Sequence, residues 1–439
     1  MLLFQLKRAF QSLLKTPNVT IISILAVTLG VGVMTSFSNT FFFFTQNPLP
    51  QKSDILFNVR LDNWTLDREP FDVEPGEPPK HSTYRDTREL MKCNIPRHQT
   101  RIGAASSYVF PEDRTQKPFA VKVRLTTHDF FPMFNVPFQF GAGWSQESDE
   151  KRDAVIVLSR DSNLKLFKGL NSVGKQVHLG ARHYTVVGVL GDYHPQPIFY
   201  DFINSQQGEI CDFFLPLDHI RETGNGLTRQ GDTNGWGSDE SFEGDSFFTV
   251  AEANWLEFWV ELAPERVEEY RMFLTNYVHS QKALGRFPRP MNNRVTPMME
   301  WVRQRNRSLS IIGTLLGISF LFLAACSVNL TGLLLGKFLS AAPQIGVFRA
   351  MGAKKRYIFS QYIIECELIA VFGGILGLAV AALGLKYLNT LNPIGDWFHL
   401  DLKTVYVAVV LSLVTGFITG LYPAWRACQV NPAIQIKIQ

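Results

Sequence analysis

The sequence predicts an α-helical membrane protein with four transmembrane helices and a large α+β extracytoplasmic domain inserted between the first and second helices. Three observations carry this prediction. Four apolar runs with few charges are long enough to cross a bilayer, which requires roughly 20 residues. The sequence between the first two runs is polar and aromatic, and strand and helix patterns alternate in it. Finally, Lys and Arg gather at one end of the apolar runs.

The four apolar runs cover about residues 19–44, 309–335, 357–385 and 405–422. The first run is too long for a cleavable signal peptide and lacks a small-residue cleavage site, so we expect it to stay as an anchor. The predicted division of the chain is a cytoplasmic amphipathic helix at 1–17, transmembrane helices at 18–45, 308–336, 357–385 and 404–423, an extracytoplasmic domain at 46–305, a cytoplasmic loop at 337–356, a short external loop at 386–403 and a cytoplasmic tail at 424–439.

Basic residues predict the orientation of the chain, because Lys and Arg near the spans favour the cytoplasmic side. Three segments next to the spans hold Lys and Arg but no Asp or Glu. Their cations are Lys7, Arg8, Lys15, Lys337, Arg349, Lys354, Lys355, Arg356, Arg426 and Lys437. We therefore expect both termini in the cytoplasm and a slightly acidic exterior domain, which does not indicate nucleic-acid binding.

The first sixteen residues have helical spacing. Apolar side chains recur at positions 3, 4, 6, 10, 13 and 14, and Lys7, Arg8 and Lys15 fall on the remaining face. A basic amphipathic helix just before a span is expected to lie in the membrane interface.

The exterior domain is predicted to mix strands and helices. We expect strands at 54–61, 101–110, 119–127, 154–158, 176–179, 184–190, 255–262 and 294–295, and helices at 82–92, 128–134, 164–168, 264–284 and 298–307. The strand–helix–strand segments 54–110 and 255–296 are expected to form paired halves of one subdomain. Residues 200–250 are expected to be irregular, and we expect them to set the choice of substrate or partner.

No catalytic constellation is present. Residues 169–176, GLNSVGKQ, match the spacing of a phosphate-binding P-loop except at Gln176, where a Ser or Thr hydroxyl would bind magnesium. A strand is expected to follow them, so we interpret them as a turn. His183 and His194, with Asp192 nearby, lack convincing metal-ligand spacing. We expect no metal, no catalytic residue and no cofactor bound by this chain.

The five cysteines give one open question. Cys326, Cys366 and Cys428 fall in or beside membrane segments, whereas Cys93 and Cys211 fall in the exterior domain. An oxidising compartment would allow these two to form a disulfide. The sequence does not show whether they are close enough to pair.

A polar, basic stretch lies between the second and third apolar runs, QIGVFRAMGAKKRYIFSQYIIECE at residues 344–367. We expect a short cytoplasmic helix at 352–359 that displays Lys354, Lys355 and Arg356 to a partner. The alternative is a loop whose cations only satisfy the positive-inside rule.

Two carboxylates lie at the end of this stretch, near the start of the third run. Glu365 and Glu367 would be costly facing lipid. We expect them to face neighbouring helices, or to form a salt bridge with the basic triplet that fixes the short helix to the span. The alternative is that both side chains extend to the membrane interface.

The stretch resembles the cytoplasmic loop of the MacB/FtsX-like ABC transporter permeases. The resemblance rests on Ile345-Gly346, Arg349-Ala350, Gly352-Ala353, the basic residues 354–356 and Glu365. Three other stretches are similar to the family: Asn329-Leu330, the tail pattern 423–427 with 431–433, and the exterior segments between residues 126 and 190. The chain departs from the family at Gln344, where Glu is usual, at residues 340–343, where Arg or Lys is frequent, and at Phe348, where Arg is common.

The resemblance implies a permease subunit of the bacterial inner membrane without an ATPase of its own. It implies a dimer with a second copy or a paired relative, and two cytoplasmic ABC ATPase subunits that bind ATP and magnesium. The residues it assigns to ATPase coupling are Gln344, Ile345, Gly346, Arg349, Gly352, Ala353, Lys354, Lys355, Arg356 and Tyr357.

Two functions are compatible with this resemblance. In the first, motion of the spans moves the exterior domain and exports or extracts a peptide, lipid or toxic compound, with a periplasmic adaptor and an outer-membrane channel as further partners. Gly373, Gly374 and Gly377 in the third run would allow helices to slide. In the alternative, a non-transporting transmembrane signaller activates a periplasmic partner such as a cell-wall hydrolase.

Overall fold

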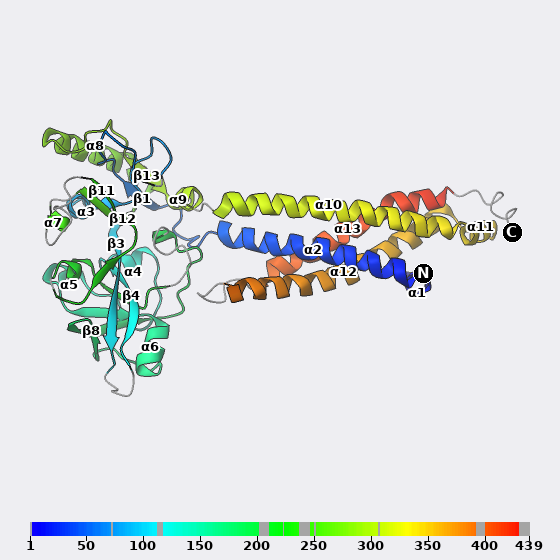
Figure 1. Cartoon of the computed structure of the whole chain (residues 1–439), viewed down its shortest axis with the longest axis horizontal. Coiled ribbons are helices and arrows are strands. Elements are labelled where there is room, and N and C mark those ends of the chain that lie inside the picture. The colour runs from blue at the N-terminus through cyan, green and yellow to red at the C-terminus, as the bar shows by residue number, and fades with distance from the viewer. Residues whose placement is uncertain are drawn as a thin grey trace. The chain divides into compact units, whose positions relative to one another are not determined.

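The structure is a computed structural model that describes residues 2–71, 73–111, 117–201, 210–222, 224–236, 246–249, 252–305, 308–391 and 400–429. The chain divides into two compact units (Figure 1). The membrane unit comprises Met1–Thr45 and Arg307–Gln439, and the inserted domain comprises Gln46–Asn306. The predicted fold class, four membrane helices with an α+β domain inserted after the first, is confirmed.

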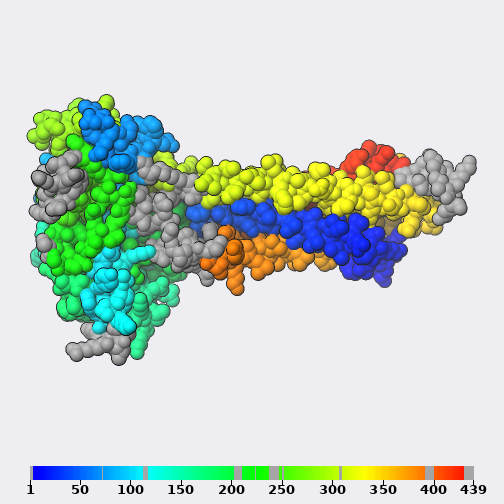
Figure 2. All heavy atoms as spheres, viewed as in Figure 1, coloured from blue at the N-terminus to red at the C-terminus, as the bar shows by residue number. Residues whose placement is uncertain are grey.

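Four helices of the membrane unit are long and apolar enough to cross a bilayer, namely α2 (Pro17–Thr45), α10 (Ser308–Ser340), α12 (Lys355–Leu391) and α13 (Leu402–Cys428). Helix α2 packs against the other three, and α12 also packs against α13. The space-filling view shows yellow α10 and orange α12 along blue α2 (Figure 2).

Small residues allow this close packing. A Cβ atom at Gly373 would lie only 2.6 Å from Val27 Cβ, and one at Gly374 would lie 2.6 Å from Ser412 Cβ. Because lipid tails supply no hydrophobic force between helices, such backbone approach is a main source of packing energy. Asn39 Nδ2 also donates to Thr404 Oγ1 at 2.7 Å and joins α2 to α13.

Three of the helices extend beyond the predicted transmembrane segments. The second span continues to Ser340, the third runs from Lys355 to Leu391, and the fourth runs from Leu402 to Cys428. Hydropathy detects only the apolar part of a helix, whereas the backbone hydrogen bonds continue through polar ends. Of the predicted external loop, residues 392–399 lie outside the described residues, and so does the predicted tail beyond residue 429.

The described strands of the inserted domain form one connected sheet. The main strand order is β13-β1-β12-β3-β4-β9-β6-β8-β5, and β2, β7, β10 and β11 pair at its margins. The strands are β1 (Leu56–Arg60), β2 (Ser82–Thr83), β3 (His98–Phe110), β4 (Phe119–Thr126), β5 (Phe138–Gly141), β6 (Val155–Leu158), β7 (Gln176–Leu179), β8 (Arg182–Leu190), β9 (Phe213–Pro216), β10 (Thr228–Gln230), β11 (Asn234–Trp236), β12 (Glu252–Glu261) and β13 (Arg294–Pro297).

The long strand β3 belongs to both halves of the domain. Its first residues pair antiparallel with β12, from His98 opposite Glu261 to Ile102 opposite Glu257. Its later residues pair antiparallel with β4. Strand β1 pairs with β12 and β13, so the predicted pairing of segments 54–110 and 255–296 is confirmed.

The other helices are shorter and are shared between the two units. The remaining helices are α1 (Leu2–Lys15), α3 (Tyr84–Leu90), α4 (Phe130–Met133), α5 (Gln146–Lys151), α6 (Arg160–Phe167), α7 (Ser246–Thr249), α8 (Val267–Ala283), α9 (Met298–Arg305) and α11 (Ala342–Ala350), with 3₁₀ turns η1 (Phe199–Asp201), η2 (Leu217–Arg221) and η4 (Pro264–Arg266). Helix α8 lies beside β13 and β1, and α5 and α6 lie with the β4–β8 half (Figure 1).

One aromatic cluster, which we call the shared core, receives both ends of the inserted domain. Leu49, four residues after α2, belongs to it, and so does Trp301 of α9, the helix that precedes α10 in sequence. Trp259 of β12 contacts Trp301 edge-to-face at 6.4 Å, and Phe134 contacts Trp259 at 6.1 Å. The two chain segments that connect to the membrane helices therefore pack into the same core.

Three segments of the inserted domain can be compared with their predictions: the start of α3, residues 169–176 and residues 200–250. The helix expected at 82–92 is α3, which begins at Tyr84 and is capped by Thr83, whose Oγ1 accepts from Asp86 N at 3.0 Å. The P-loop-like residues form a turn, in which Gly174 N donates to Val186 O at 2.8 Å and β7 follows. Residues 200–250 contain β9, β10, β11 and short helices, while 202–209 and 237–245 lie outside the described residues.

The disulfide considered for Cys93 and Cys211 is absent, because both cysteines are free. Cys93 packs with Phe57 and Tyr270 in the β12 half. Cys211 leads into β9 in the other half, where β9 pairs with β4 and β6. Burial raises the pKa of both thiols, so each behaves as a small apolar side chain.

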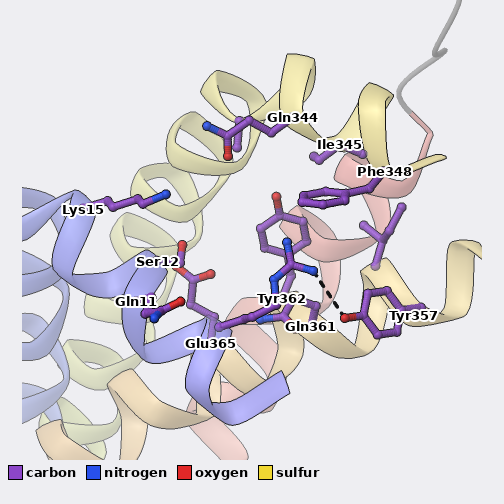
Figure 3. Close-up of a pocket in the computed structure, with 13 residues that line it drawn as sticks. Gln11, Ser12, Lys15, Gln344, Ile345, Phe348, Tyr357, Gln361, Tyr362 and Glu365 are labelled. Carbon is purple, nitrogen blue, oxygen red and sulfur yellow. Dashed lines mark hydrogen bonds between the residues drawn. The ribbon is translucent and has the colours of Figure 1, made fainter. Parts of the chain in front are cut away.

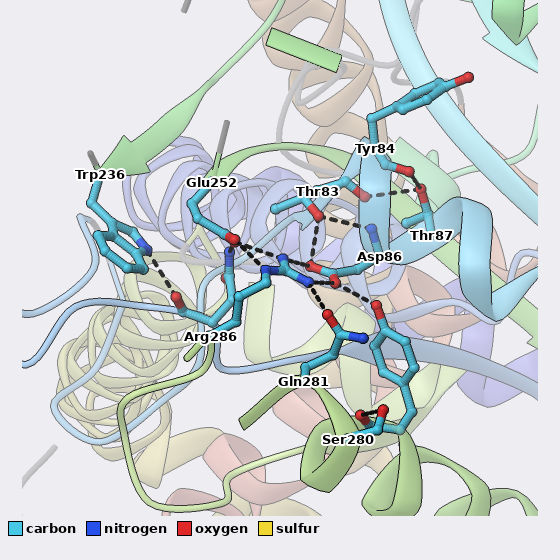
Figure 4. Close-up of polar contacts among 11 residues, drawn as sticks. Thr83, Tyr84, Asp86, Thr87, Trp236, Glu252, Ser280, Gln281 and Arg286 are labelled. Carbon is cyan, nitrogen blue, oxygen red and sulfur yellow. Dashed lines mark hydrogen bonds and ion pairs between the residues drawn. The ribbon is translucent and has the colours of Figure 1, made fainter. Parts of the chain in front are cut away.

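A buried arginine ties together three elements of the inserted domain. The Arg286 guanidinium, just after α8, bonds both oxygens of Asp86 at 2.8 and 3.0 Å and both oxygens of Glu252 at 2.5 and 2.9 Å (Figure 4). Tyr277 Oη donates to Asp86 Oδ1 at 2.6 Å. Burial alone would lower the pKa of Arg286, but the two carboxylates outweigh it and raise the pKa.

We predict that Arg286→Ala strongly destabilises the inserted domain, because it leaves Asp86 and Glu252 buried without their cation. Loss of one partner of a buried ion pair costs roughly 3–5 kcal/mol. Urea unfolding of the full chain, followed by Trp fluorescence, measures the loss. The control is Lys92→Ala, which breaks an exposed pair with Glu89 and should cost less than about 1 kcal/mol. Equal losses in the two variants would contradict the prediction.

A chain of alternating histidines and aspartates joins β3 to α5. His98 Nδ1 lies 2.7 Å from Asp129 Oδ1, and His128 Nε2 lies 3.4 Å from the same oxygen. His128 Nδ1 lies 2.9 Å from Asp149 Oδ2. Burial alone would lower the pKa of His128, but the Asp149 hydrogen bond and the charges of Asp129, Asp149 and Glu150 raise it above the ordinary value of 6.5.

Because of this network, we predict that the free energy of unfolding falls as the pH rises. A raised folded pKa means that protonated His128 adds stability below pH 6.5 and that this stability is lost as pH rises through the folded pKa. The free energy of unfolding should therefore fall between about pH 6 and pH 8, and His128→Gln should flatten the curve. The control is exposed His194→Gln. An unchanged slope in His128→Gln would refute the assignment.

Candidate functional site

The candidate site lies at the basic end of the membrane unit, where α1, α11 and the first turns of α12 meet. Helix α1 buries Gln5, Ala9 and Leu13, which recur at helical spacing. It exposes an apolar stripe that includes Leu3 and Phe4. The predicted amphipathic helix is therefore present, with one face packed on protein and another available to lipid.

Three polar contacts fasten α1 to α12. Gln5 Nε2 donates to Ser360 Oγ at 3.0 Å, and Gln361 Nε2 donates to Gln5 O at 3.2 Å. One and a half turns further along α12, Ser12 Oγ donates to Glu365 Oε1 at 3.1 Å. Thr20 Oγ1 of α2 bonds Leu13 O at 2.9 Å, so α1 is also fixed to the span that follows it.

The predicted salt bridge of Glu365 exists, but with a different cation. Glu365 pairs with Lys337 of α10 and not with Lys354, Lys355 or Arg356. The reason is geometric: both side chains are turned into the helix bundle, with exposed fractions of 1% and 6%, whereas the basic triplet faces outward. Among the described residues, Glu367 has no ion-pair partner, and its Oε2 is buried without a hydrogen bond.

The short helix of the cytoplasmic loop was predicted at the wrong place. It is α11 (Ala342–Ala350), with Pro343 in its first turn, and not residues 352–359. Gly352 ends it with φ +96°, Gly352 N bonds Arg349 O at 3.1 Å, and Ala353 N bonds Phe348 O at 3.0 Å. This is a Schellman cap, whose left-handed position favours glycine. Residues from Lys355 onward already belong to α12.

The residues predicted for ATPase coupling separate into two groups. Ile345 and Gly346 are buried, and Arg349, Ala353 and Tyr357 are half-buried. The other predicted residues are exposed. Val347 and Met351, which were not predicted, are exposed beside them. We call this set the α11 surface: Gln344, Val347, Met351, Gly352, Lys354, Lys355 and Arg356. Val347 and Met351 are 48% and 69% exposed.

Arg8 of α1 connects the three helices. Its guanidinium lies over the Phe348 ring of α11, 4.3 Å from the centroid. Its Nη1 donates a long hydrogen bond of 3.4 Å to Tyr357 Oη of α12 (Figure 3). A cation over an aromatic face is attractive, and more so where water is partly excluded. Phe348 is therefore the α11 contact of Arg8.

A cavity of about 150 Å³ opens between these elements (Figure 3). It is lined by Arg8, Gln11, Ser12, Lys15, Ala341, Gln344, Ile345, Phe348, Tyr357, Ile358, Gln361, Tyr362 and Glu365. Sequence reasoning missed the contribution of α1 to it. The available signal was the polar spacing Gln5, Arg8, Ser12 and Lys15, which places one polar stripe on a helix that otherwise reads as lipid-facing.

Metal chemistry finds no support in the described part of the chain. No three His, Cys, Asp or Glu side chains there are grouped closely enough to hold an ion. His183 stacks on His178 at 4.4 Å between ring centroids, and His194 lies 3.3 Å from exposed Asp192.

Two known protein families match most of this chain. Residues 20–264 match the MacB-like periplasmic core domain, and residues 316–432 match the FtsX-like permease C-terminal region. The chain belongs to the MacB/FtsX-like family of ABC transporter permeases. Members of this family work with an ATPase, and the four apolar helices and periplasmic domain fit a multi-pass inner-membrane protein.

Individual relatives are distant. The probable export ATP-binding/permease protein MacB of Pseudomonas entomophila is 21% identical over 314 residues, covering 71% of this chain and 41% of the relative. The uncharacterized ABC transporter permease YvrN of Bacillus subtilis is 21% identical over 315 residues, covering 71% and 68%. The permease thus spans about two fifths of the length of that MacB relative.

Among solved structures, the periplasmic region of MacB from Actinobacillus actinomycetemcomitans aligns with a TM-score of 0.37 and 14% identity. The alignment covers 58% of this chain and 94% of that one.

We predict that Glu365→Ala destabilises the helix bundle of the permease, because it leaves Lys337 buried without its counter-ion. The expected loss is roughly 3–5 kcal/mol, and replacing both residues by Leu should recover much of it. Thermal denaturation in mild detergent measures the change. The control is Glu367→Ala, which removes a carboxylate two residues away with no ion pair among the described residues. A similar loss in the control would contradict the prediction.

Proposed function

We propose that this permease couples ATP hydrolysis by a separate cytoplasmic ABC ATPase to motion of its periplasmic domain. The motion would export or extract a peptide, lipid or toxic compound at the outer face of the inner membrane. The observation that carries the proposal is the α11 surface, which presents apolar side chains at the end of the capped helix α11 and cations around the start of α12.

The chemistry of the α11 surface suits a protein partner. Lys354, Lys355 and Arg356 are exposed together. Exposed Val347 lies on the preceding helix, and exposed Met351 is the residue that directly follows it. Interfaces combine a charged rim, which guides encounter, with a few apolar side chains that enter pockets. An ATPase with an acidic rim around an apolar cleft would fit this surface. The alternative, a loop whose cations only satisfy the positive-inside rule, gives no reason for the exposed apolar side chains Val347 and Met351.

Displacement of α11 has a physical route to the rest of the membrane unit. Buried Ile345 and the Arg8–Phe348 contact join α11 to the bundle and to α1. The hydrogen bond between Thr20 and Leu13 joins α1 to α2. Packed helices respond to such contacts by shifting as bodies, which is how a small displacement at one site is passed on.

In the periplasmic domain, the shared core supports the final step of the proposal. Both segments that lead to membrane helices, represented by Leu49 and Trp301, pack into it. Relative motion of α2 and α10 would therefore act on a single core. The cavity of about 150 Å³ is smaller than the roughly 300 Å³ at which ligand pockets begin, so we assign substrate handling to the periplasmic domain.

The proposed assembly contains a second permease copy or a paired relative and an ATPase dimer that binds ATP and magnesium. A periplasmic adaptor and an outer-membrane channel are further proposed partners for export.

Affinity purification of the permease from native membranes in mild detergent distinguishes export from signalling. Recovery of an ATPase with an adaptor or channel supports export, whereas an ATPase with a cell-wall hydrolase supports signalling. Absence of any ATPase would refute both.

We predict that reversing the three cations of the α11 surface, Lys354→Glu with Lys355→Glu and Arg356→Glu, abolishes stimulation of the ATPase. Like charges facing an acidic partner cost several kcal/mol, enough to reduce association by more than about a hundredfold. The measurement is ATP hydrolysis by the co-purified ATPase with wild-type or variant permease in vesicles.

The control for this experiment reverses two exposed cations at the other end of the bundle, Lys386→Glu and Lys403→Glu. It should leave stimulation unchanged. Full stimulation by the triple variant would show that the α11 surface does not couple to the ATPase.

A further inference from the structure

The cavity between α1, α11 and α12 carries uncompensated positive charge. Two of its lining residues are cations, Arg8 and Lys15, and one is an anion, Glu365. Glu365 is already paired with Lys337, which lies outside the lining. The charge of the Glu365 carboxylate is therefore balanced by Lys337. The positive charges of Arg8 and Lys15 remain unbalanced in the cavity.

The cavity also presents hydrogen-bond donors with no partner in the described part of the chain. The side chains of Lys15, Gln11 and Gln344 form no hydrogen bond or ion pair with another described residue. Arg8 uses one N–H group on Tyr357 and its flat face on Phe348, which leaves its other N–H groups available. Figure 3 shows Lys15, Ser12, Gln344 and Tyr362 around the same space.

Size and position restrict the ligand. A volume of about 150 Å³ suits a small polar group. The outer surface of α1 exposes Leu3, Phe4, Phe10 and Leu14, so this helix faces the acyl region of a bilayer. A ligand with a compact polar head and apolar tails would satisfy both surfaces.

We propose that this cavity binds the phosphate group of an anionic phospholipid headgroup. Arg and Lys are the side chains that bind phosphate most strongly, Arg through several parallel N–H groups and Lys as a point charge. Basic pockets at the cytoplasmic ends of membrane helices bind such headgroups. The Gln11 and Gln344 amides would donate to the remaining phosphate oxygens. A soluble phosphate ester has the same chemistry and is the other source of this ligand.

A bound headgroup would join α1 to α11, because its partners Arg8 and Lys15 belong to the first helix and Gln344 to the second. Lipid composition would then adjust how firmly α11 is held. This effect on the ATPase rests on the proposed coupling function. The binding itself does not, and it can be measured without ATP or an ATPase.

The test is native mass spectrometry of the full-length permease, purified in neutral detergent, stripped of lipid and titrated with phosphatidylglycerol or phosphatidylcholine. Phosphatidylglycerol should bind more tightly than zwitterionic phosphatidylcholine. Lys15→Gln should weaken phosphatidylglycerol binding about fivefold, the effect of one cation near a lipid phosphate. Gln344→Glu, which places a negative charge in the cavity, should weaken it further. Both residues are exposed, so neither change threatens folding.

The matched control is Lys7→Gln, which removes an exposed lysine from the same helix without altering the cavity lining. It should leave the preference for phosphatidylglycerol intact. Equal binding of the two lipids, or equal weakening by Lys7→Gln and Lys15→Gln, would overturn the proposal. Displacement of phosphatidylglycerol by inorganic phosphate or glycerol phosphate at comparable concentrations would support the phosphate site and assign it to a soluble ligand.

Discussion

The membrane unit depends on one buried ion pair, Lys337 with Glu365. Charges inside a helix bundle are tolerated only when they are paired, because lipid and protein interior both lack the water that would solvate them. The pair joins α10 to α12, and the hydrogen bond from Ser12 adds α1 to the same point. The position of α1 then determines where Arg8 meets Phe348, and with it the arrangement of the whole basic end.

The periplasmic domain has a comparable centre in its shared core. Trp301 and Leu49 enter it from opposite ends of the inserted sequence, and Trp259 of β12 contacts Trp301 edge-to-face. A core that is close-packed resists small deformations and transmits larger ones. The permease therefore has one ionic centre in its membrane unit and one aromatic centre in its periplasmic domain, and α2 and α10 are the helices that adjoin the periplasmic domain in sequence.

Features set by local pattern could be predicted from the sequence, and features set by distant partners could not. The four spans follow from apolar length, and strands such as β4 follow from alternation of Val121, Val123 and Leu125 with polar neighbours. The partner of Glu365 could not be predicted, because Lys337 lies on another helix. The α11 helix was misplaced because its apolar face is satisfied by tertiary packing at Ile345, which periodicity alone does not reveal. The separation of Cys93 from Cys211 likewise depends on which half of the sheet each joins.

The dual pairing of β3 has a consequence for how such permeases can be recombined. Residues 98–102 of this strand pair with β12, and residues 103–109 pair with β4. A chimaera that exchanges either half of the periplasmic domain at the middle of β3 would divide one continuous strand between two parents. Viable crossovers would have to keep β3 with both of its neighbours. Diversity among relatives would then accumulate as insertions at the ends of strands, while the sheet itself is inherited as a unit.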